Sequence, residues 1–228
     1  MFWNEEENLD NFQAPQNVID LSFKISCQQI KLDHAWSLTD AISDLVPWIK
    51  DEPQLAIHHI YIPQAGNGWE RVDNFQDELI QLSRRTRLKI RVPNKKITQL
   101  QAITGETITV DGNKLTFGQP ETHLLSTMTT IIARHVHIPE TDDDEDLFLR
   151  IAQKQINALG IQVRKMLCGK SHQLKTTSGI IKTRSLMVAD ISPDESILLQ
   201  EKGIGDYYRY GCGIFIPQKG ITAVNSSD

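Results

Sequence analysis

Two groups of residues in this sequence could act on a phosphate. Near the end of the chain, residues 202–213 carry glycines around a cluster of tyrosine and arginine; the glycines are Gly203, Gly205, Gly211 and Gly213. Glycine adopts positive φ angles and lacks a side chain, so its backbone N–H groups can close on an anion. In the first third of the chain, His58 and His59 precede a glycine-containing loop at 63–68. The pattern favours a phosphate-containing substrate, although a glycine-rich hairpin in an ordinary sheet has the same composition.

The chemistry that such histidines offer is metal-independent cleavage of RNA. A neutral imidazole removes the proton of a ribose 2′-hydroxyl, that oxygen attacks the phosphate, an acid protonates the leaving 5′-oxygen, and cations stabilise the charge. Because successive strand residues face opposite ways, one of His58 and His59 is expected to face the core and the other to be exposed. His34 is expected to cap or pack at the first helix, and His135 and His137 lack a third metal ligand at a fitting spacing. We therefore predict neither a metal nor a cofactor.

Neither common nucleotide-binding glycine motif is present. Tyr208 stands where the dinucleotide fingerprint needs its third glycine. A P-loop ending at 169–171 would need a glycine where Arg164 stands. The glycines therefore form neither a dinucleotide-binding motif nor a P-loop.

Charge is segregated along the chain. The net charge is −5, but the acidity is concentrated in two blocks, 5–10 and 140–146. Residues 84–96 hold seven cations and no acid, and residues 150–184 again hold cations without an acid. Separate basic runs predict a polyanion-binding face, where a simple solvated surface is the alternative.

The number of cysteines and the hydropathy indicate the cellular environment of the protein. Cys27, Cys168 and Cys212 are too few and too scattered for a disulfide framework or a zinc ribbon. The first residues are acidic and have no signal-peptide core, and no run approaches the roughly 20 apolar residues of a membrane span. We therefore expect a soluble cytoplasmic protein without a membrane partner.

The predicted elements repeat the order βαββαβ twice. In the first half we expect strands at 18–25, 54–62 and 87–92, helices around 38–46 and 94–103, and a hairpin at 107–117 around Asp111-Gly112. In the second half we expect strands at 128–137, 162–166 and 184–191, helices at 145–159 and 194–201, and a last strand after the glycines. This order predicts an α+β fold of two tandem ferredoxin-like (RRM-like) units. The predicted divisions are an acidic tail at 1–16, an N-terminal unit at 17–122 and a C-terminal unit at 123–228.

Several motifs resemble a known family. The segments are 33–38 (DHAWSL), 45–48 (LVPW), 56–58 (AIH), 84–93 (RRTRLKIRVP), 199–205 (LQEKGIG) and 211–217 (GCGIFIP). They are similar to the CRISPR repeat-processing endoribonucleases, the Cas-six family, and most similar to its MYXAN-type branch. The resemblance runs from 18 to 217, and the terminal glycine loop is its most specific mark.

The resemblance implies a site as well as a fold. The family's catalytic histidine follows the first helix, and the match falls on His58, with His59 as the alternative. Ser43 stands in the region where some members carry a catalytic tyrosine, and Tyr61 or Arg71 are alternatives for that second proton-transfer group. The residues expected to contact RNA are Arg84, Arg87, Lys170, Lys175, Lys182, Arg184, Lys202, Gly203, Gly205, Arg209, Gly211 and Gly213.

The function implied by this resemblance is CRISPR RNA processing. The chain is expected to bind the stem-loop of the precursor repeat, cut it without metal to leave a 2′,3′-cyclic phosphate, and stay on the guide with other effector-complex subunits. One alternative is a non-catalytic subunit that caps the 3′ handle of the guide. The other is a protein-binding scaffold, which predicts no salt-dependent affinity for RNA.

Overall fold

The N-terminal half of the chain forms a five-stranded antiparallel sheet. The computed structural model describes residues 17–61, 78–141 and 144–218. The strands of this sheet, in the spatial order β3-β5-β1-β7-β6, are β1 (Val18–Ser26), β3 (Ala56–Ile57), β5 (Arg87–Pro93), β6 (Thr107–Val110) and β7 (Asn113–Leu124). The helices are α1 (Ala35–Leu45) and α2 (Ile97–Gln101), each with an adjoining 3₁₀ turn, at Pro47–Asp51 and Asn94–Lys96. A separate pair, β2 (Gln29–Lys31) and β4 (Leu79–Gln81), completes this half.

Local sequence explains the elements of the first half. β1 is the central strand, and its apolar residues Ile19, Leu21, Phe23 and Ile25 alternate with polar ones, of which Asp20 and Ser22 are also buried. β6 and β7 are joined by Asp111 and Gly112, which have φ values of 47° and 81°. Two positive φ angles define the tight hairpin turn that matches the twist of its strands, so the predicted hairpin is confirmed.

The C-terminal half forms a four-stranded sheet with two helices. Its strands, in the spatial order β11-β8-β10-β9, are β8 (Ile131–Val136), β9 (Lys165–Thr176), β10 (Gly179–Ala189) and β11 (Phe215–Pro217). The N-cap of α3 (Glu145–Ala158) is Asp144, whose side chain accepts a hydrogen bond from the Leu147 N–H. α4 (Pro193–Lys202) begins with a capping box between Ser192 and Glu195. Both helices begin where the capping rules place them.

The two halves share one topology. In each sheet the first strand lies between the third and the fourth, with β1 between β5 and β7, and β8 between β10 and β11. That order, combined with βαββαβ connectivity, defines a ferredoxin-like unit, so the predicted tandem fold is confirmed. The predicted division between residues 122 and 123 falls inside β7, and residues 125–130 connect the sheets. The acidic tail at 1–16 lies outside the described residues.

Four predicted elements differ in extent. The strand expected at 54–62 is regular only over Ala56–Ile57, because the residues after His58 bond to other parts of the molecule, His59 to Tyr210 and Ile60 to His34. The strands expected at 162–166 and 184–191 are one long hairpin of β9 and β10, because the antiparallel ladder continues to the turn at 177–178. The helix expected at 94–103 is a 3₁₀ turn followed by the short α2. The loop expected at 63–68 lies outside the described residues.

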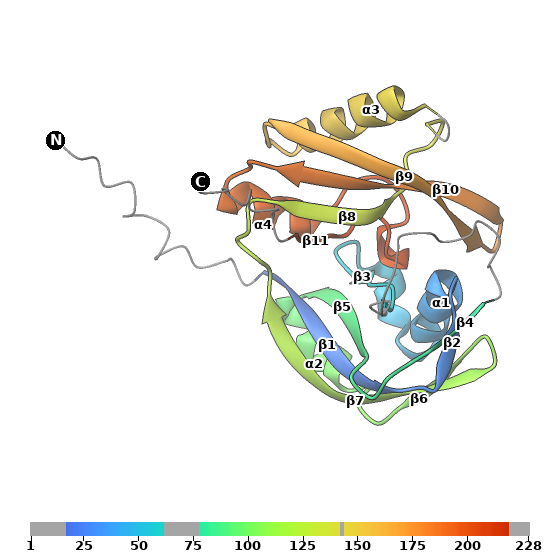
Figure 1. Cartoon of the computed structure of the whole chain (residues 1–228). Coiled ribbons are helices and arrows are strands. Elements are labelled where there is room, and N and C mark those ends of the chain that lie inside the picture. Colours follow the sequence, from blue (N-terminus) through green and yellow to red (C-terminus); the bar gives the residue numbers. More distant parts are fainter. Residues whose placement is uncertain (1–16, 62–77, 142–143, 219–228) are drawn as a thin grey trace, which may run out of the picture.

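α1 lies between the two sheets, as Figure 1 shows. An apolar cluster joins α1 to the second half and contains Ala35, Trp36, Leu174 and Cys212, with Ile181 and Tyr210 packed on it. We call this contact the seam. It brings the end of β3 against the glycine-rich segment. No helix in the described part of the chain has both the length and the apolar character needed to cross a membrane.

Candidate active site

His58 lies in a buried charged cluster with Asp20 and Arg91. Its Nε2 is 3.4 Å from Asp20 Oδ1, a contact without hydrogen-bond geometry. Arg91 donates from Nε and Nη2 to the two carboxylate oxygens of Asp20, at 2.8 and 3.1 Å. Burial lowers the pKa of His58, and this effect outweighs the attraction of the Asp20 carboxylate. Burial alone would raise the pKa of Asp20, but Arg91 and His58 together hold it well below its usual range.

The charged cluster also joins the two ferredoxin-like units. Arg91 has no exposed surface, and its Nη1 donates to the backbone carbonyls of Gln200 at 2.7 Å and Phe215 at 3.0 Å. These acceptors belong to α4 and β11, while Arg91 belongs to β5. A buried guanidinium that is bonded on all sides has a structural function. His58 therefore faces the interior, as one member of the histidine pair was expected to do.

His59 faces the seam instead. Its Nε2 lies 2.9 Å from the carbonyl oxygen of Tyr210. A carbonyl can only accept a hydrogen bond, so Nε2 carries the proton and Nδ1 carries the lone pair. The ring is half-buried. This arrangement leaves Nδ1 as the nitrogen that can act as a base.

Gly211 allows this approach of the two units. Its φ is +87°, and a Cβ added there would lie 2.6 Å from His59 Nε2 and 2.8 Å from the Ile57 carbonyl oxygen. No larger residue fits at that position without displacing the histidine. Gly211, the first residue of the 211–217 segment, thus packs directly against the candidate base.

Four aromatic rings from both units gather around His59. The His135 ring centroid is 4.8 Å from that of His59, the Tyr61 centroid 5.9 Å and the His34 centroid 6.2 Å. His172 follows at 5.4 Å from His135, in an edge-on contact. We call His59, Tyr61, His135 and His172 the histidine cluster. Its members come from the end of β3 and from β8 and β9, so the cluster spans the two units.

His34 fixes the backbone that carries the cluster. Its Nε2 accepts a hydrogen bond from the Ile60 N–H at 2.9 Å, and its Nδ1 lies 2.8 Å from the Lys31 carbonyl oxygen. Nδ1 must therefore carry the proton, and the ring is neutral. His34 is the N-cap residue of α1, but its side chain makes no capping hydrogen bond. Of the two predicted roles, capping is wrong, and the ring instead holds the segment between His59 and Tyr61.

Aromatic packing forms the wall of the seam beside this cluster. The Trp36 ring stacks on Tyr210, with centroids 4.5 Å apart and planes at 16°, and contacts Tyr207 edge-on at 5.3 Å. The Tyr210 hydroxyl donates to Asp40 Oδ1 at 3.3 Å. These contacts hold the Tyr210 carbonyl where it meets His59.

The other glycines of the terminal segment also support backbone packing. The Gly213 N–H donates to the His135 carbonyl at 2.6 Å, and the Gly205 N–H donates to Gln155 Oε1 at 2.8 Å. Gly203 and Gly213 are buried. The segment is thus folded onto β8 and β3, which accounts for its glycines without an anion.

The predicted RNA-contacting cations are spread over several surfaces. Arg84, Lys170, Lys175 and Lys202 are exposed. Arg87 lies 3.6 Å from Glu121, and Arg184 lies 3.8 Å from Glu145 at the start of α3. Lys182 and Arg184 share the face of β10 that carries Leu186, opposite to Thr183. Arg209 donates through Nη2 to the Lys50 carbonyl.

The residues predicted as a second proton-transfer group lie in different surroundings. Ser43 is buried, and its hydroxyl donates to the Thr39 carbonyl at 2.7 Å within α1, so it is occupied inside the helix. Tyr61 does lie in the histidine cluster, and Arg71 lies outside the described residues. Sequence reasoning missed Arg134, whose guanidinium carbon lies 4.3 Å above the Tyr61 ring. It also considered His135 only as a metal ligand, together with His137, and found no third ligand for them.

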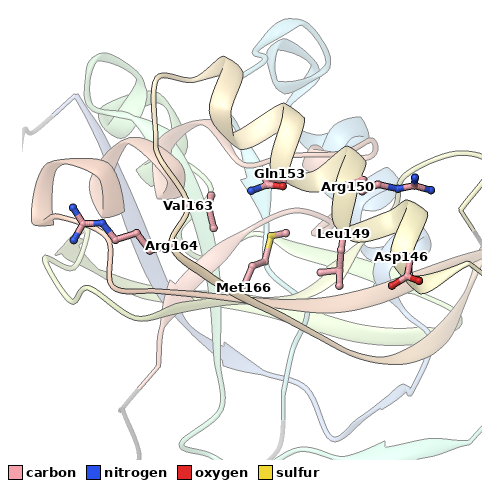
Figure 2. A pocket seen from close by; sticks show the side chains of 7 residues that line it. All are labelled: Asp146, Leu149, Arg150, Gln153, Val163, Arg164 and Met166. Atoms are coloured by element: carbon pink, nitrogen blue, oxygen red, sulfur yellow. The ribbon is translucent and has the colours of Figure 1, made fainter.

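A separate pocket lies between α3 and the start of β9. It has a volume of about 480 Å³ and is lined by Asp146, Leu149, Arg150, Gln153, Val163, Arg164 and Met166. Figure 2 shows Arg150 and Arg164 at its opposite ends, between α3 and the chain entering β9. None of the predicted site residues lines it. In the part of the chain that the structure describes, no group of three or more His, Cys, Asp or Glu could hold a metal ion.

These observations define a class of protein: a tandem ferredoxin-like chain with a histidine cluster between its units and a glycine-rich segment closing the cluster. The family model described as Cas6 Crispr matches residues 19–220. The chain therefore belongs to the Cas6 family of CRISPR-associated proteins.

Known proteins agree with this assignment. The chain is 26% identical over 208 residues to the CRISPR-associated endonuclease Cas6 of Myxococcus xanthus, covering 91% of this chain and 85% of that protein. A Cas6-related protein from Pyrococcus furiosus has the same fold, with a TM-score of 0.60, 12% identity, and coverage of 87% of this chain and 97% of the other. A second structure, of a CRISPR-associated protein Cas6, gives a TM-score of 0.58 at 9% identity, covering 89% and 100%.

Proposed function

We propose that this protein is a metal-independent endoribonuclease that cuts the repeat of precursor CRISPR RNA. The observation that carries the proposal is the His59–Tyr210 hydrogen bond, which fixes the imidazole as a base at the contact of the two units. Family membership supports CRISPR RNA as the substrate. The name of the Myxococcus xanthus relative, an endonuclease, supports cleavage over binding alone.

The reaction follows from the state of His59. Nδ1 takes the proton of the ribose 2′-hydroxyl, and the 2′-oxygen attacks the adjacent phosphorus. The bond from phosphorus to the 5′-oxygen breaks as that oxygen gains a proton, which leaves a 2′,3′-cyclic phosphate. Arg134 lies over the Tyr61 ring of the same cluster, and we assign it as the cation that stabilises charge on the phosphorane.

His58, the first choice from the sequence, is less suited to this role. Its Nε2 atom is buried and lies 3.4 Å from the carboxylate of Asp20, which is bonded in turn to the fully buried Arg91. A substrate ribose would have to open that cluster to reach the imidazole. We therefore assign the base to His59, which the sequence offered as the alternative.

Binding of the repeat would come from the exposed cations. Arg84, Lys170, Lys175 and Lys202 are accessible for phosphate contacts. Each phosphate neutralised by a protein cation releases counterions, so affinity falls as salt rises. Tight product binding in the cytoplasm would keep the protein on the mature guide, together with other effector-complex subunits.

The test is cleavage of a labelled repeat RNA from the neighbouring array, with EDTA present, followed by analysis of the product ends. Cutting that leaves a 2′,3′-cyclic phosphate supports the proposal. Salt-dependent binding without cutting would make the protein the guide-capping subunit. No salt-dependent RNA affinity would favour a protein-binding scaffold.

A further inference from the structure

We propose that His135, contributed by the C-terminal unit, is the general acid that protonates the leaving 5′-oxygen. This inference rests on the proposed function, and it names the second proton-transfer group that the sequence left open. His135 lies on β8, and its ring centroid is 4.8 Å from that of His59 with the planes tilted by 34°. A phosphate that contacts the base is therefore within about one ring width of a second imidazole.

Thr183 determines which nitrogen of the His135 ring can exchange a proton. His135 Nδ1 lies 3.0 Å from Thr183 Oγ1, and the Thr183 hydroxyl can donate onward to the His172 carbonyl at 3.4 Å. With its own proton directed at a carbonyl, the hydroxyl oxygen accepts from His135 Nδ1. Nε2 is then the nitrogen that gains and loses a proton. A threonine thus orients His135 as the Tyr210 carbonyl orients His59.

The proximity of the two rings favours different protonation states. Two imidazolium ions whose rings are 4.8 Å apart repel each other, so the doubly charged state is disfavoured. Tyr61 and His172 also contact this pair, and Arg134, which lies over the Tyr61 ring, adds positive charge to the cluster. One neutral and one protonated histidine is the state that concerted acid–base cleavage requires.

The other groups fit the role less well. The Ser43 hydroxyl is committed to its own helix. Tyr61 lies farther from His59 than His135 does, at 5.9 Å, and its ring face is covered by Arg134. A phenol is also a weaker acid than an imidazolium near neutral pH. His172 contacts His135 and not His59 among the ring contacts of the described residues.

Two proton transfers accompany the displacement at phosphorus. The 2′-oxygen–phosphorus bond forms as His59 Nδ1 receives the 2′-hydroxyl proton. The phosphorus–5′-oxygen bond breaks as the proton on His135 Nε2 moves to that oxygen. The products are the cyclic phosphate, a 5′-hydroxyl, protonated His59 and neutral His135, and exchange with water restores both histidines.

The experiment compares two substrates: ordinary repeat RNA, and the same RNA with sulfur replacing the bridging 5′-oxygen at the scissile phosphate. A thiolate leaves without protonation, so loss of the acid is tolerated on the sulfur substrate. The variant His135→Asn keeps an N–H that can reach Thr183 but has no group that titrates. We expect it to cut ordinary RNA about 10²–10³-fold more slowly than wild type and the sulfur substrate within roughly tenfold of wild type. His59→Gln should be slow on both.

Two further variants complete the design. His123→Asn, at an exposed position of β7, should behave as wild type on both substrates. Thr183→Val, which keeps the shape of the side chain, should show a smaller loss that the sulfur substrate also restores. An equal loss on both substrates by His135→Asn with wild-type RNA affinity, or no loss on ordinary RNA, would overturn the assignment. Failure of wild type to cut either RNA would instead refute the proposed function.

Discussion

Two neighbouring histidines, one residue apart, lie in opposite kinds of surroundings. His58 lies against Asp20, whose carboxylate is bonded to the fully buried Arg91. His59 lies with Tyr61 and His172, which are partly buried like His59 itself, and with the buried His135, and these rings meet across the two units. The charged cluster joins the units, and the histidine cluster is where we place the chemistry. Strand alternation thus directs His58 into the charged cluster that joins the units and His59 into the cluster where we place the chemistry.

The largest expected effect on stability is at the charged cluster. Arg91→Met leaves Asp20 as an uncompensated buried carboxylate and removes both bonds to the second unit. Breaking a buried pair by removing one partner costs about 3–5 kcal/mol. Urea unfolding of wild type and variant measures the difference, and a loss under about 1 kcal/mol would show that the cluster does not join the units.

Gly211→Ala should have the next largest effect, and it acts on the histidine cluster. The left-handed backbone alone costs about 1–2 kcal/mol, and the overlap with His59 adds to that. Gly105 is the matched control, because its φ is +92° and nothing lies within 4 Å of an added Cβ. Gly105→Ala should lose stability but keep full cleavage, whereas Gly211→Ala should lose both. Equal cleavage by the two variants would contradict the packing role of Gly211.

The pH dependence of stability should report on His58. Its pKa is lowered in the folded protein from 6.5, so unfolding takes up a proton as the pH falls. The stability from keeping His58 neutral is therefore present above pH 6.5 and is lost as the pH falls below that value. The contribution of Asp20 to stability is also lost as the pH falls, but at lower pH, because its pKa is lowered in the folded protein as well.

The check is the unfolding midpoint of wild type and His58→Gln between about pH 7.5 and about pH 5. The glutamine variant should show a shallower decline, because it lacks the group that takes up the proton. Parallel declines would mean that His58 is not held neutral by its surroundings.

The smallest effect is expected from Arg87→Met, on the same strand as Arg91. Arg87 lies 3.6 Å from Glu121 with 31% of its side chain exposed. Exposed pairs contribute about 0–1 kcal/mol, so this variant should unfold within about 0.5 kcal/mol of wild type. A loss as large as that of Arg91→Met would show that burial is not what distinguishes the two arginines.

Much of the fold followed from local pattern. The alternation of β1, the Asp111-Gly112 turn and the capping residues of α4 act within a few residues, so the sequence displays them. The ends of β3 and the length of the β9–β10 hairpin depend on partners far along the chain. Their extents were therefore predicted incorrectly.

The site was harder to predict than the fold. Alternation predicted that one of His58 and His59 would face inward, but which one depends on Asp20 and Arg91, which no spacing connects to them. His135 and Thr183 are 48 positions apart, and His59 and Tyr210 are 151 apart. The glycines signalled a close backbone approach, and the structure identifies the approaching group at Gly211 as a histidine.

The most direct test of this account is cleavage of repeat RNA in EDTA by His59→Gln and His58→Gln in parallel, with RNA affinity measured for both. Loss of a general base lowers the rate by about 10²–10⁴-fold. We predict that loss for His59→Gln at wild-type affinity, and a rate within roughly tenfold of wild type for His58→Gln. The reverse result, with His58→Gln inactive and His59→Gln active, would contradict the account.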